Sequence, residues 1–361
     1  LKDSDHEIYW FNVTDSGEFV RRMDWINQRY GWRLKRDFPG RTRLKVALPQ
    51  LSKFIERLNT NSTKKAFESY LKSVKPDVVH SFVLHISCMP ILSVMMNYKD
   101  IKWIYSAWGN DLYYHQYISK DKVRISKTLP YLNYMFADCQ RDIDLAEQLG
   151  FKGKSLGVFP GGGGYSLTMI NEDLKPPNQR SGIIIKGYQG KLHRGLNAIK
   201  ALERLRKIPK VTIFSADQIL TDYIQNSSKL DIENFEIYGK NTSISHKDLC
   251  RVMNRNLIYI GNNLSDGMPN TLLEAICFGS FPIQSNPGGA SAEIITHGEN
   301  GLLIEDCENI SEIQACIEIA LNNNDLVKNA FKVNQKLKYS IEHEYIKKKV
   351  LKKYDDVKKE L

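Results

Sequence analysis

The sequence has 361 residues, of which 42% are hydrophobic and 25% charged, and its formal net charge is +10. This length and composition predict a globular chain of two domains and exclude a disordered tail. The six cysteines form no Cys-X-X-Cys pair, which argues against a disulfide framework or a zinc ribbon and favours reduced thiols in a cytosol. No secretory signal is evident, and the longest apolar stretch, Phe82 to Met96, is too short to span a bilayer.

The first half alternates short apolar runs with helix-period segments, the pattern of a parallel sheet covered by helices. The predicted strands are Glu7–Val13, Asp77–Phe82, Ile101–Ser106 and Ser155–Phe159. We expect residues 1–170 to form an N-terminal Rossmann-like domain.

The positive charge gathers in one segment of this half. Between Arg21 and Lys75 lie 15 Lys or Arg residues and four acids, a local balance of 15 − 4 = +11, so the rest of the chain is close to neutral. Aromatic and aliphatic side chains are interleaved with these cations. A solvated helical face is one interpretation, and a surface for anionic lipid headgroups or nucleic acid is the other. We favour a membrane surface, because no nucleic-acid signature accompanies the charge.

The pattern breaks at residues 171–180, a polar segment with two prolines that we predict to be a linker, and then resumes. The strands predicted after it are Ile183–Lys186, Val211–Ser215, Phe235–Tyr238, Leu257–Gly261, Phe281–Gln284 and Leu302–Ile304. Leu196–Lys207 and His246–Arg255 are predicted as helices between them. We therefore expect a doubly wound second domain at 181–335, with ligands outside the carboxyl ends of its strands. Residues 336–361 end in a charged helix that we expect to pack back on the N-terminal domain.

Two acids eight positions apart mark the second half. Pro269 or Asn270 is a good helix start and Gly279 a good helix end, so Asp266 is predicted in the loop before a helix and Glu274 in its second turn. Both carboxylates can then face one crevice, where the free amides of the helix start favour an anionic ligand. A helix cap at Asp266 and a surface acid at Glu274 remain the structural alternative.

This region resembles the signature of family 4 glycosyltransferases, which are retaining GT-B enzymes with nucleotide-sugar donors. The matching residues are Ser265-Asp-Gly-Met-Pro-Asn-Thr-Leu-Leu-Glu-Ala275, Gly279, Pro282, Gly288-Gly289, Glu293-Ile-Ile295 and Asn300-Gly-Leu-Leu303. A weaker likeness covers Pro76-Asp-Val-Val-His-Ser81, Ile104-Tyr-Ser-Ala-Trp-Gly-Asn-Asp111, Ala137-Asp138, Leu149-Gly150 and Val158-Phe-Pro-Gly161 in the family's order. The resemblance implies two Rossmann-like domains facing a cleft, with the acceptor on the N-terminal side.

The resemblance assigns the ribose hydroxyls to Glu274 and the transferred sugar to Asp266. It also implies that the amides of Gly267 and Met268 bind sugar hydroxyls, beside Pro269 and Asn270. Gly288 and Gly289 are further donor-binding candidates. The family usually has Glu at the first acid, so Asp266 is a departure that shortens the reach by one methylene.

The family's diphosphate site corresponds to Lys186-Gly-Tyr-Gln-Gly-Lys-Leu-His-Arg-Gly195. There an Arg follows the first glycine and a Lys precedes the second; this chain has Tyr188 and Arg194 in those places. We expect Arg194, helped by Lys191, to neutralise the departing diphosphate. A basic helix start with solvated Lys191 and Arg194 is the competing interpretation.

The N-terminal half holds the remaining candidates. Many relatives have a histidine where this chain has Trp108, and Asp111 is available to the donor sugar or acceptor as a catalytic candidate. His80 and His115 are possible sugar or acceptor contacts, although structural roles are the commoner outcome for such residues. His85 is a weaker candidate of the same kind.

Three short motifs resemble functional sites but also have a plain structural interpretation. Asp142-Ile-Asp144 has the Asp-X-Asp form of a metal site, but it lies in the predicted first turns of a helix, where acids suit the dipole. Gly153-Lys-Ser155 lacks the upstream glycine of a phosphate loop. The glycines at 161–164 fit either a ligand contact or a flexible corner. We expect no metal and no cofactor.

The family has a first strand, a glycine-containing loop and a helix before the segment that resembles His6-Glu-Ile-Tyr-Trp-Phe11. The chain starts at Leu1 without methionine, so we expect those elements to be missing from it.

The predicted function is therefore retaining transfer of a hexose or N-acetylhexosamine, from a nucleotide-diphosphate sugar with UDP favoured. The expected acceptor is a polysaccharide or lipid-linked glycan at the cytosolic membrane face, with the enzyme cytoplasmic or peripheral and no nucleic-acid partner. A nucleotide-sugar epimerase of the same fold and a non-catalytic partner of another transferase stay open as alternatives.

Overall fold

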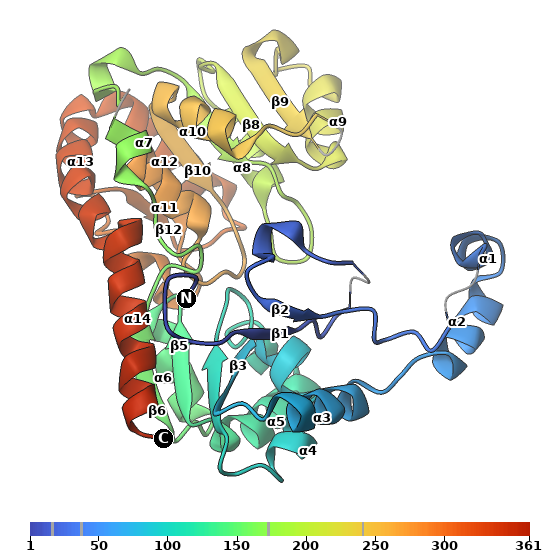
Figure 1. Ribbon diagram of the computed structural model, residues 1–361. Helices are drawn as coiled ribbons and strands as arrows, with labels where there is room; N and C mark the ends of the chain where they lie inside the picture. The colour runs from blue at the N-terminus through green and yellow to red at the C-terminus, as the bar shows by residue number, and fades with distance from the viewer. Residues whose placement is uncertain (16–17, 37–38, 172–173, 240–241) are drawn as a thin grey trace.

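Two parallel β-sheets, each packed with helices, organise the chain (Figure 1). The computed structural model describes residues 1–15, 18–36, 39–171, 174–239 and 242–361. The α/β fold with parallel sheets in two Rossmann-like domains that the sequence predicts is confirmed, and the reversal of strand order that defines a doubly wound sheet is seen in the described strands of the C-terminal sheet.

The N-terminal sheet has four parallel strands in the order β3-β4-β5-β6. Their bounds are β3 Val78–Phe82, β4 Lys102–Ser106, β5 Tyr134–Ala137 and β6 Lys154–Val158. A separate parallel pair joins β1 (Tyr9–Phe11) to β2 (Asn27–Arg29). Two strands were not predicted: β2, whose three polar residues carry no strand signal, and β5.

The C-terminal sheet has six parallel strands in the order β12-β11-β10-β7-β8-β9. Their bounds are β7 Ile183–Lys186, β8 Val211–Ala216, β9 Phe235–Gly239, β10 Ile258–Gly261, β11 Phe281–Ser285 and β12 Leu302–Ile304. All six strands were predicted to within two residues. Isoleucine and valine runs that are buried on both faces give a strong sequence signal for such central strands.

The helices of the N-terminal half are α1 Arg41–Ala47, α2 Pro49–Leu58, α3 Thr63–Val74, α4 Leu92–Met95, α5 Ser119–Thr128, α6 Gln140–Gln148 and α7 Leu167–Asn171. Those of the C-terminal half are α8 Gly195–Leu202, α9 Gln218–Asn226, α10 His246–Arg255, α11 Asn270–Cys277, α12 Ile310–Asn322, α13 Asn324–Leu337 and α14 His343–Lys359. Helix α8 ends at Leu202, whereas the sequence predicted that this helix would continue to Lys207. Each helix in the described ranges is too short or too polar to cross a lipid bilayer.

Apolar side chains fill both faces of the C-terminal sheet. One cluster joins β7, β8 and β10 to α8, α9 and α12, and a second on the opposite face joins the sheet to α10 and α11. The strands therefore stand as rigid supports for the loops at their ends.

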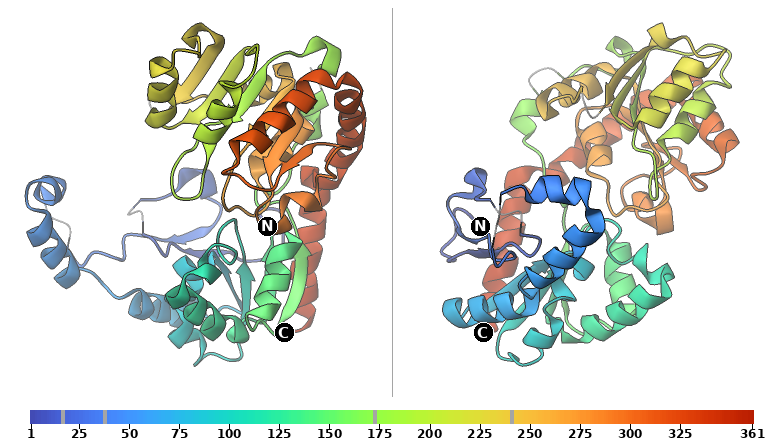
Figure 2. Two further views of the ribbon diagram at one scale, coloured as in Figure 1. Left: turned by 180° about the vertical axis from the view of Figure 1, so that it is seen from behind. Right: turned by 90° about the vertical axis from the view of Figure 1, so that its right-hand side faces the viewer.

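Helix α14 returns from the C-terminal domain and runs along the N-terminal sheet (Figure 1). Val357 is buried in a cluster with Ile104, Phe136 and Leu156. The hydroxyl of Tyr134 donates to Glu360 at 2.6 Å. This helix ties the two domains together on the side away from α1 and α2, which project from the body of the molecule (Figure 2).

Candidate active site

The loops that follow the carboxyl ends of both sheets meet between the domains. A cavity of about 350 Å³ is lined by loops after β10, β11 and β12 and by Tyr113 of the N-terminal domain. Gly288 and Gly289, predicted to bind the donor, line this cavity and a second one of about 460 Å³. The interdomain position is where doubly wound sheets bind ligands.

Several buried polar atoms in the loops that lead to this interface have no hydrogen-bond partner among the described residues. They include Asn110 Oδ1 and Asp138 Oδ1 from the N-terminal domain, and Asn262 Oδ1 and Ser265 Oγ from the C-terminal domain. Buried polar groups are nearly always paired, so each such atom points to a water molecule or a polar ligand beside it. The four atoms come from loops that follow β4, β5 and β10.

One ammonium group acts on both Asp266 and Glu274. Asp266 lies in the loop after β10, where Asn263 Nδ2 donates to its Oδ2 at 2.9 Å. The Nζ of Lys186, the last residue of β7, is 3.8 Å from the same oxygen. Lys186 also acts electrostatically on Glu274. Its side chain is only 11% exposed, so a largely buried cation stands beside Asp266 and stabilises the charge of both acids.

Glu274 lies on α11 as predicted, and its side chain is buried. Burial raises the pKa of the Glu274 carboxyl, whereas the nearby His246 and Lys186 lower it. His246, the first residue of α10, is within 2.8 Å of Oε1 and is itself exposed. A buried carboxylate with one exposed partner can exchange that partner for a ligand hydroxyl.

Asp138 reaches the Gly267 corner from the other domain. It follows β5, its side chain is 7% exposed, and Gly109 N–H donates to its Oδ2 at 3.0 Å. A Cβ on Gly267 would lie 2.3 Å from Asp138 Oδ1, so glycine is required there while the domains are in contact. Burial, together with the nearby Asp266, raises the pKa of Asp138 to about 6.

A second interdomain contact lies at the start of α6. The carboxylate of Glu293 accepts hydrogen bonds from the backbone N–H groups of Gln140 and Arg141, at 2.7 and 2.9 Å. Arg141 Nη1 donates to the carbonyl of Pro287 at 2.6 Å, and its guanidinium packs over the ring of Tyr113. An acid at a helix N-terminus is favourable both as a cap and for the dipole. The contact covers Gly288, where a Cβ would lie 2.3 Å from the Tyr113 ring.

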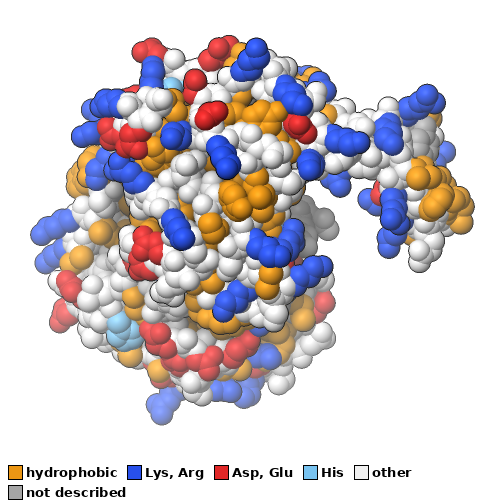
Figure 3. Space-filling model, turned by 90° about the horizontal axis from the view of Figure 1, so that it is seen from below, with side chains coloured by type: hydrophobic (Ala, Val, Ile, Leu, Met, Phe, Trp, Pro, Cys, Tyr) orange, Lys and Arg blue, Asp and Glu red, His pale blue; other side chains and the backbone are white. Residues whose placement is uncertain are grey.

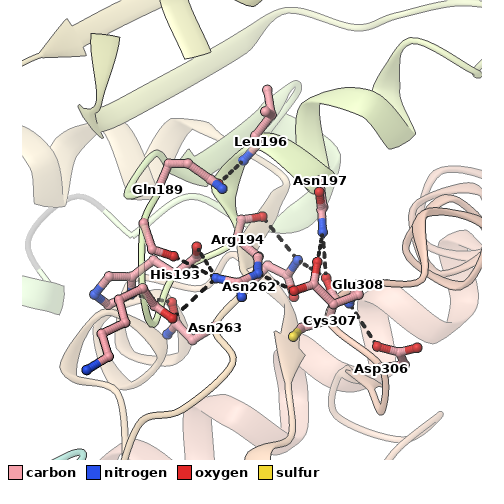
Figure 4. A network of polar contacts seen from close by, with 12 residues as sticks. Gln189, His193, Arg194, Leu196, Asn197, Asn262, Asn263, Asp306, Cys307 and Glu308 are labelled. Atoms are coloured by element: carbon pink, nitrogen blue, oxygen red, sulfur yellow. Dashed lines mark hydrogen bonds and ion pairs between the residues drawn. The ribbon is translucent and has the colours of Figure 1, made fainter. Parts of the chain in front are cut away.

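The guanidinium of Arg194 is occupied within its own domain (Figure 4). Its Nε donates to Glu308, and its Nη1 donates to the carbonyls of Gly190 and His193, at 2.7 and 3.0 Å. Glu308 also accepts from Asn197 at 2.9 Å. In this arrangement Arg194 fixes the loop between β7 and α8, and a phosphate would have to displace Glu308 to reach it.

The other two candidates of this loop lie toward the N-terminal domain. The ammonium of Lys191 is 4.8 Å from the ring centre of Tyr114, across the domain interface. The ring of Tyr188 is 40% exposed and lies 5.5 Å from Lys186 Nζ. Lys186 is thus beside the residue that replaces the family's arginine.

Trp108 and Phe82 form an exposed aromatic pair at the ends of β4 and β3. Each is 43% exposed, and their ring centres are 5.1 Å apart. Gly109, the next residue, is close to Asp266: a Cβ there would lie 3.6 Å from Asp266 Oδ1. The pair therefore stands near the end of the site that holds Asp266.

Asp111 supports this pair from within the N-terminal domain. Its side chain is buried, and it accepts from Leu84 N–H at 2.6 Å and from the hydroxyl of Tyr105. Val83, the residue between Phe82 and Leu84, has φ +66°, a strained value for a β-branched side chain. Asp111 thus anchors a strained turn, and its contacts are those of a positioning residue.

The histidine candidates are engaged by other side chains. His80 lies between Tyr354 of α14 and Ser106, at 2.6 and 2.8 Å, and burial lowers its pKa to about 3. His115 Nδ1 is 2.8 Å from Asp121, and its ring lies beside that of His85. The structure therefore gives both the structural contacts that the sequence analysis weighed for them.

The two acids of the Asp-X-Asp motif point to different environments. Asp142 is fully buried, and Arg141 Nη2 lies 2.8 Å from it, whereas Asp144 is exposed and accepts from Gln140 Nε2. Asp138, Cys139 and Asp142 do bring ligand-type atoms within 4.8 Å of one another. The guanidinium of Arg141 already supplies positive charge to that group, which disfavours a cation there.

Lys186, Asp138, Glu293 and His246 were not predicted as site residues, although the first three lie in segments that resemble the family. A cation that ends a strand directly before a glycine loop could have singled out Lys186. His246 and Asp138 contact the site only through the packing of separate elements, so their roles cannot be read from the neighbouring residues.

Comparison with known proteins agrees with this geometry. Residues 191–338 match the family model described as glycosyl transferases group 1. No curated protein matches the sequence. Among solved structures, sucrose-phosphate synthase from Thermosynechococcus elongatus is 13% identical with a TM-score of 0.70, over 98% of this chain and 90% of that one. A UDP-forming α,α-trehalose-phosphate synthase from Burkholderia xenovorans is 12% identical with a TM-score of 0.65, over 96% and 92%. Anabaena HepE in complex with UDP and glucose is 11% identical with a TM-score of 0.62, over 92% and 87%.

Proposed function

We propose that the protein is a nucleotide-sugar-dependent glycosyltransferase similar to family 4, because residues 191–338 match the glycosyl transferases group 1 model and the chain shares the fold of glycosyltransferases of known structure. It transfers a hexose or N-acetylhexosamine, with retention, from a nucleotide-diphosphate sugar to a polysaccharide or lipid-linked glycan at the cytosolic membrane face. UDP is favoured as the nucleotide, because HepE was solved with UDP and the trehalose-phosphate synthase is UDP-forming.

One observation carries the proposal: the largely buried ammonium of Lys186, at the carboxyl end of β7, is 3.8 Å from Asp266 and also acts electrostatically on Glu274. With Glu274 on the ribose and Asp266 on the sugar, the group between them is the diphosphate. An ammonium at that point stabilises the negative charge that develops as the glycosidic bond breaks. Lys186 then takes the part of the arginine that Tyr188 replaces.

The remaining groups hold the reactants. The amides of Gly267 and Met268 are assigned to the sugar hydroxyls, which would replace Asp266 Oδ1 as the acceptor for the Gly267 N–H and Asp138 as the acceptor for that of Met268. Pro269 and Asn270 begin α11 beside them. Lys191 reaches from the loop between β7 and α8 toward the interface, and Arg194 fixes that loop through Glu308. Rate enhancement in this scheme rests on positioning and on charge stabilisation by the chain's own cations, without a metal.

The acceptor is assigned to the N-terminal domain. The exposed rings of Trp108 and Phe82 are tilted by 49° to each other, and either ring offers an apolar face on which a sugar ring can stack, close to Asp266. Asp111 holds the turn that presents Phe82.

A calorimetric titration with UDP, GDP and ADP tests the donor class, and product analysis with the corresponding sugar nucleotides tests transfer. We expect UDP to bind, and a Glu274→Ala variant to lose donor turnover while remaining folded. If no nucleoside diphosphate binds, the proposed function is wrong. An isomerised sugar nucleotide formed without acceptor would indicate an epimerase, and binding without any turnover would indicate a non-catalytic partner.

A further inference from the structure

We infer that the projecting segment of residues 39–58, which contains α1 and α2 and is called the arm below, docks on an anionic lipid bilayer. The inference rests on the proposed membrane-bound acceptor and assigns the contact to one element of the chain. Figure 1 and the left view of Figure 2 show the arm standing away from the body of the protein.

The base of the arm is fixed to the protein. Lys35 N–H donates to the carbonyl of Asn59 at 2.9 Å, and Asn61 N–H donates to that of Arg33 at 2.7 Å. The side chain of Asn59 exchanges two more hydrogen bonds with the backbone of Arg36, at 3.0 and 2.6 Å. The arm is therefore held by a short ladder and is not a loose tail.

Helix α2 presents an apolar stripe to solvent. Leu51, Phe54 and Leu58 follow the i, i+3, i+7 spacing of one helix face, and they are 47%, 62% and 61% exposed. Val46 and Leu48, at the turn between α1 and α2, are 81% and 52% exposed. Large apolar side chains gathered in this way on a projecting element mark a contact surface.

Cations surround the stripe. Over residues 43–58 the arm carries Arg43, Lys45, Lys53 and Arg57 against the single acid Glu56, and all four cations are exposed. Figure 3 shows hydrophobic and basic side chains side by side on the projecting arm. An apolar face flanked by Lys and Arg is the composition of helices that lie in the interface of anionic membranes.

Charge decides between a bilayer and a second copy of the chain. Two arms packed face to face would bring their cations together, and like charges at close range oppose association. Phosphatidylglycerol headgroups supply the missing negative charge, while the acyl chains accept Leu51, Phe54 and Leu58.

The structure also shows that only part of the basic region from Arg21 to Lys75 combines cations with exposed apolar side chains. Helix α3, with Lys64, Lys65 and Lys72, packs Phe67 and Leu71 into the N-terminal core. It therefore has cations but no exposed apolar stripe, and we assign it a supporting electrostatic part only.

Vesicle flotation tests the inference with the full chain. The vesicles are pure phosphatidylcholine, or equal parts of phosphatidylcholine and phosphatidylglycerol, each at low and high salt. The variants are Leu51→Ser/Phe54→Ser/Leu58→Ser for the stripe and Lys53→Glu/Arg57→Glu for the cations. Ile219→Ser/Ile232→Ser/Ile319→Ser, which removes exposed apolar residues elsewhere, is the matched control.

We expect the wild type and the control to bind the anionic vesicles, and each arm variant to bind roughly tenfold more weakly or worse. UDP binding should be unchanged in all variants, so a failure of the arm is distinguishable from a failure of the donor site. Unchanged vesicle binding in both arm variants would overturn the inference. A wild type that ignores vesicles but forms a dimer, which the stripe variant dissociates, would overturn it in favour of self-association.

Discussion

The carboxylate of Asp138 in the N-terminal domain lies against the backbone of Gly267 in the C-terminal domain, where any Cβ would come within 2.3 Å of its Oδ1. Gly267 is one residue from Asp266 and begins the corner that leads into α11. The interface between the domains is thus built directly on the corner proposed to hold the donor sugar. The contact between the domains and the proposed binding of the donor therefore both depend on Asp138 and Gly267.

A Gly267→Ala variant should lose transfer activity because the new methyl group forces Asp138 away and separates the domains. We expect kcat/KM to fall by roughly a hundredfold, since small displacements of reacting groups have effects of that size. The double variant Gly267→Ala/Asp138→Gly should recover part of this loss. Gly161→Ala, whose methyl would meet its nearest neighbour at an ordinary 3.8 Å, is the control. Equal activity of Gly267→Ala and wild type would contradict the described contact.

The stability of the protein should depend on pH through Asp138. Its pKa is raised from 3.8 to about 6, so the folded protein holds this proton more tightly than the unfolded chain does. The contribution of Asp138 to stability therefore falls as pH rises from about 4 to about 6 and stays constant above.

An Asp138→Asn variant, which stays neutral, should then gain stability relative to wild type across the same range. Its advantage should be near zero at about pH 4 and reach at most about 3 kcal/mol at about pH 7. Urea unfolding at several pH values measures this difference in the free energy of unfolding. A difference that shrinks with rising pH would contradict the predicted direction.

Glu293 should control how firmly the domains close. A Glu293→Gln variant keeps the shape of the side chain but loses the charge that caps the first turn of α6, a change of about 1 kcal/mol. We expect a larger radius of gyration by small-angle X-ray scattering and a higher KM for the donor. Glu299→Gln, at another exposed acid, should change neither quantity.

Substitutions of Lys186 and of Arg194 should weaken phosphate binding to different extents. A Lys186→Met variant should weaken UDP binding by at least about tenfold and leave uridine binding unchanged, because only the diphosphate faces the ammonium. Arg194→Met should have the smaller direct effect on UDP, since its guanidinium is already bound by Glu308. Calorimetry with both ligands decides this. Equal losses for UDP and uridine in Lys186→Met would point to a general structural defect.

His246 should lower the pKa of the Glu274 carboxyl. Burial raises the pKa of the Glu274 carboxyl and His246 opposes that rise, so removing the imidazole in His246→Ala should raise this pKa further. A Glu274 that must be ionised to hold the ribose would then be protonated at higher pH. The acidic limb of the kcat/KM profile should therefore move to higher pH, by an amount that the profile measures directly. An unchanged limb would mean that Glu274 does not govern it.

The central strands and the corner were predictable because their causes are local. Runs such as Ile183–Lys186 are apolar over their whole length, and the Gly267, Pro269 and Gly279 positions fix a turn and both helix ends. The strand β2 was missed because Asn27–Arg29 forms a strand only through pairing with β1. The role expected for Arg194 depended on spacing alone, which cannot reveal that Glu308, more than a hundred residues away, holds the guanidinium.

Patterns along the chain were enough to predict the two-sheet fold, the corner with Asp266 and Glu274 that we propose holds the donor, and the basic character of the segment from Arg21 to Lys75. Local propensity, turn chemistry and charge are properties of neighbouring residues, so a pattern along the chain is enough to show them. The packing of distant elements was needed to show which cation acts on both acids and that Asp138 meets Gly267 across the interface. It also separated the projecting arm from the rest of the basic segment. These are distances between residues far apart in the chain, and packing alone sets them.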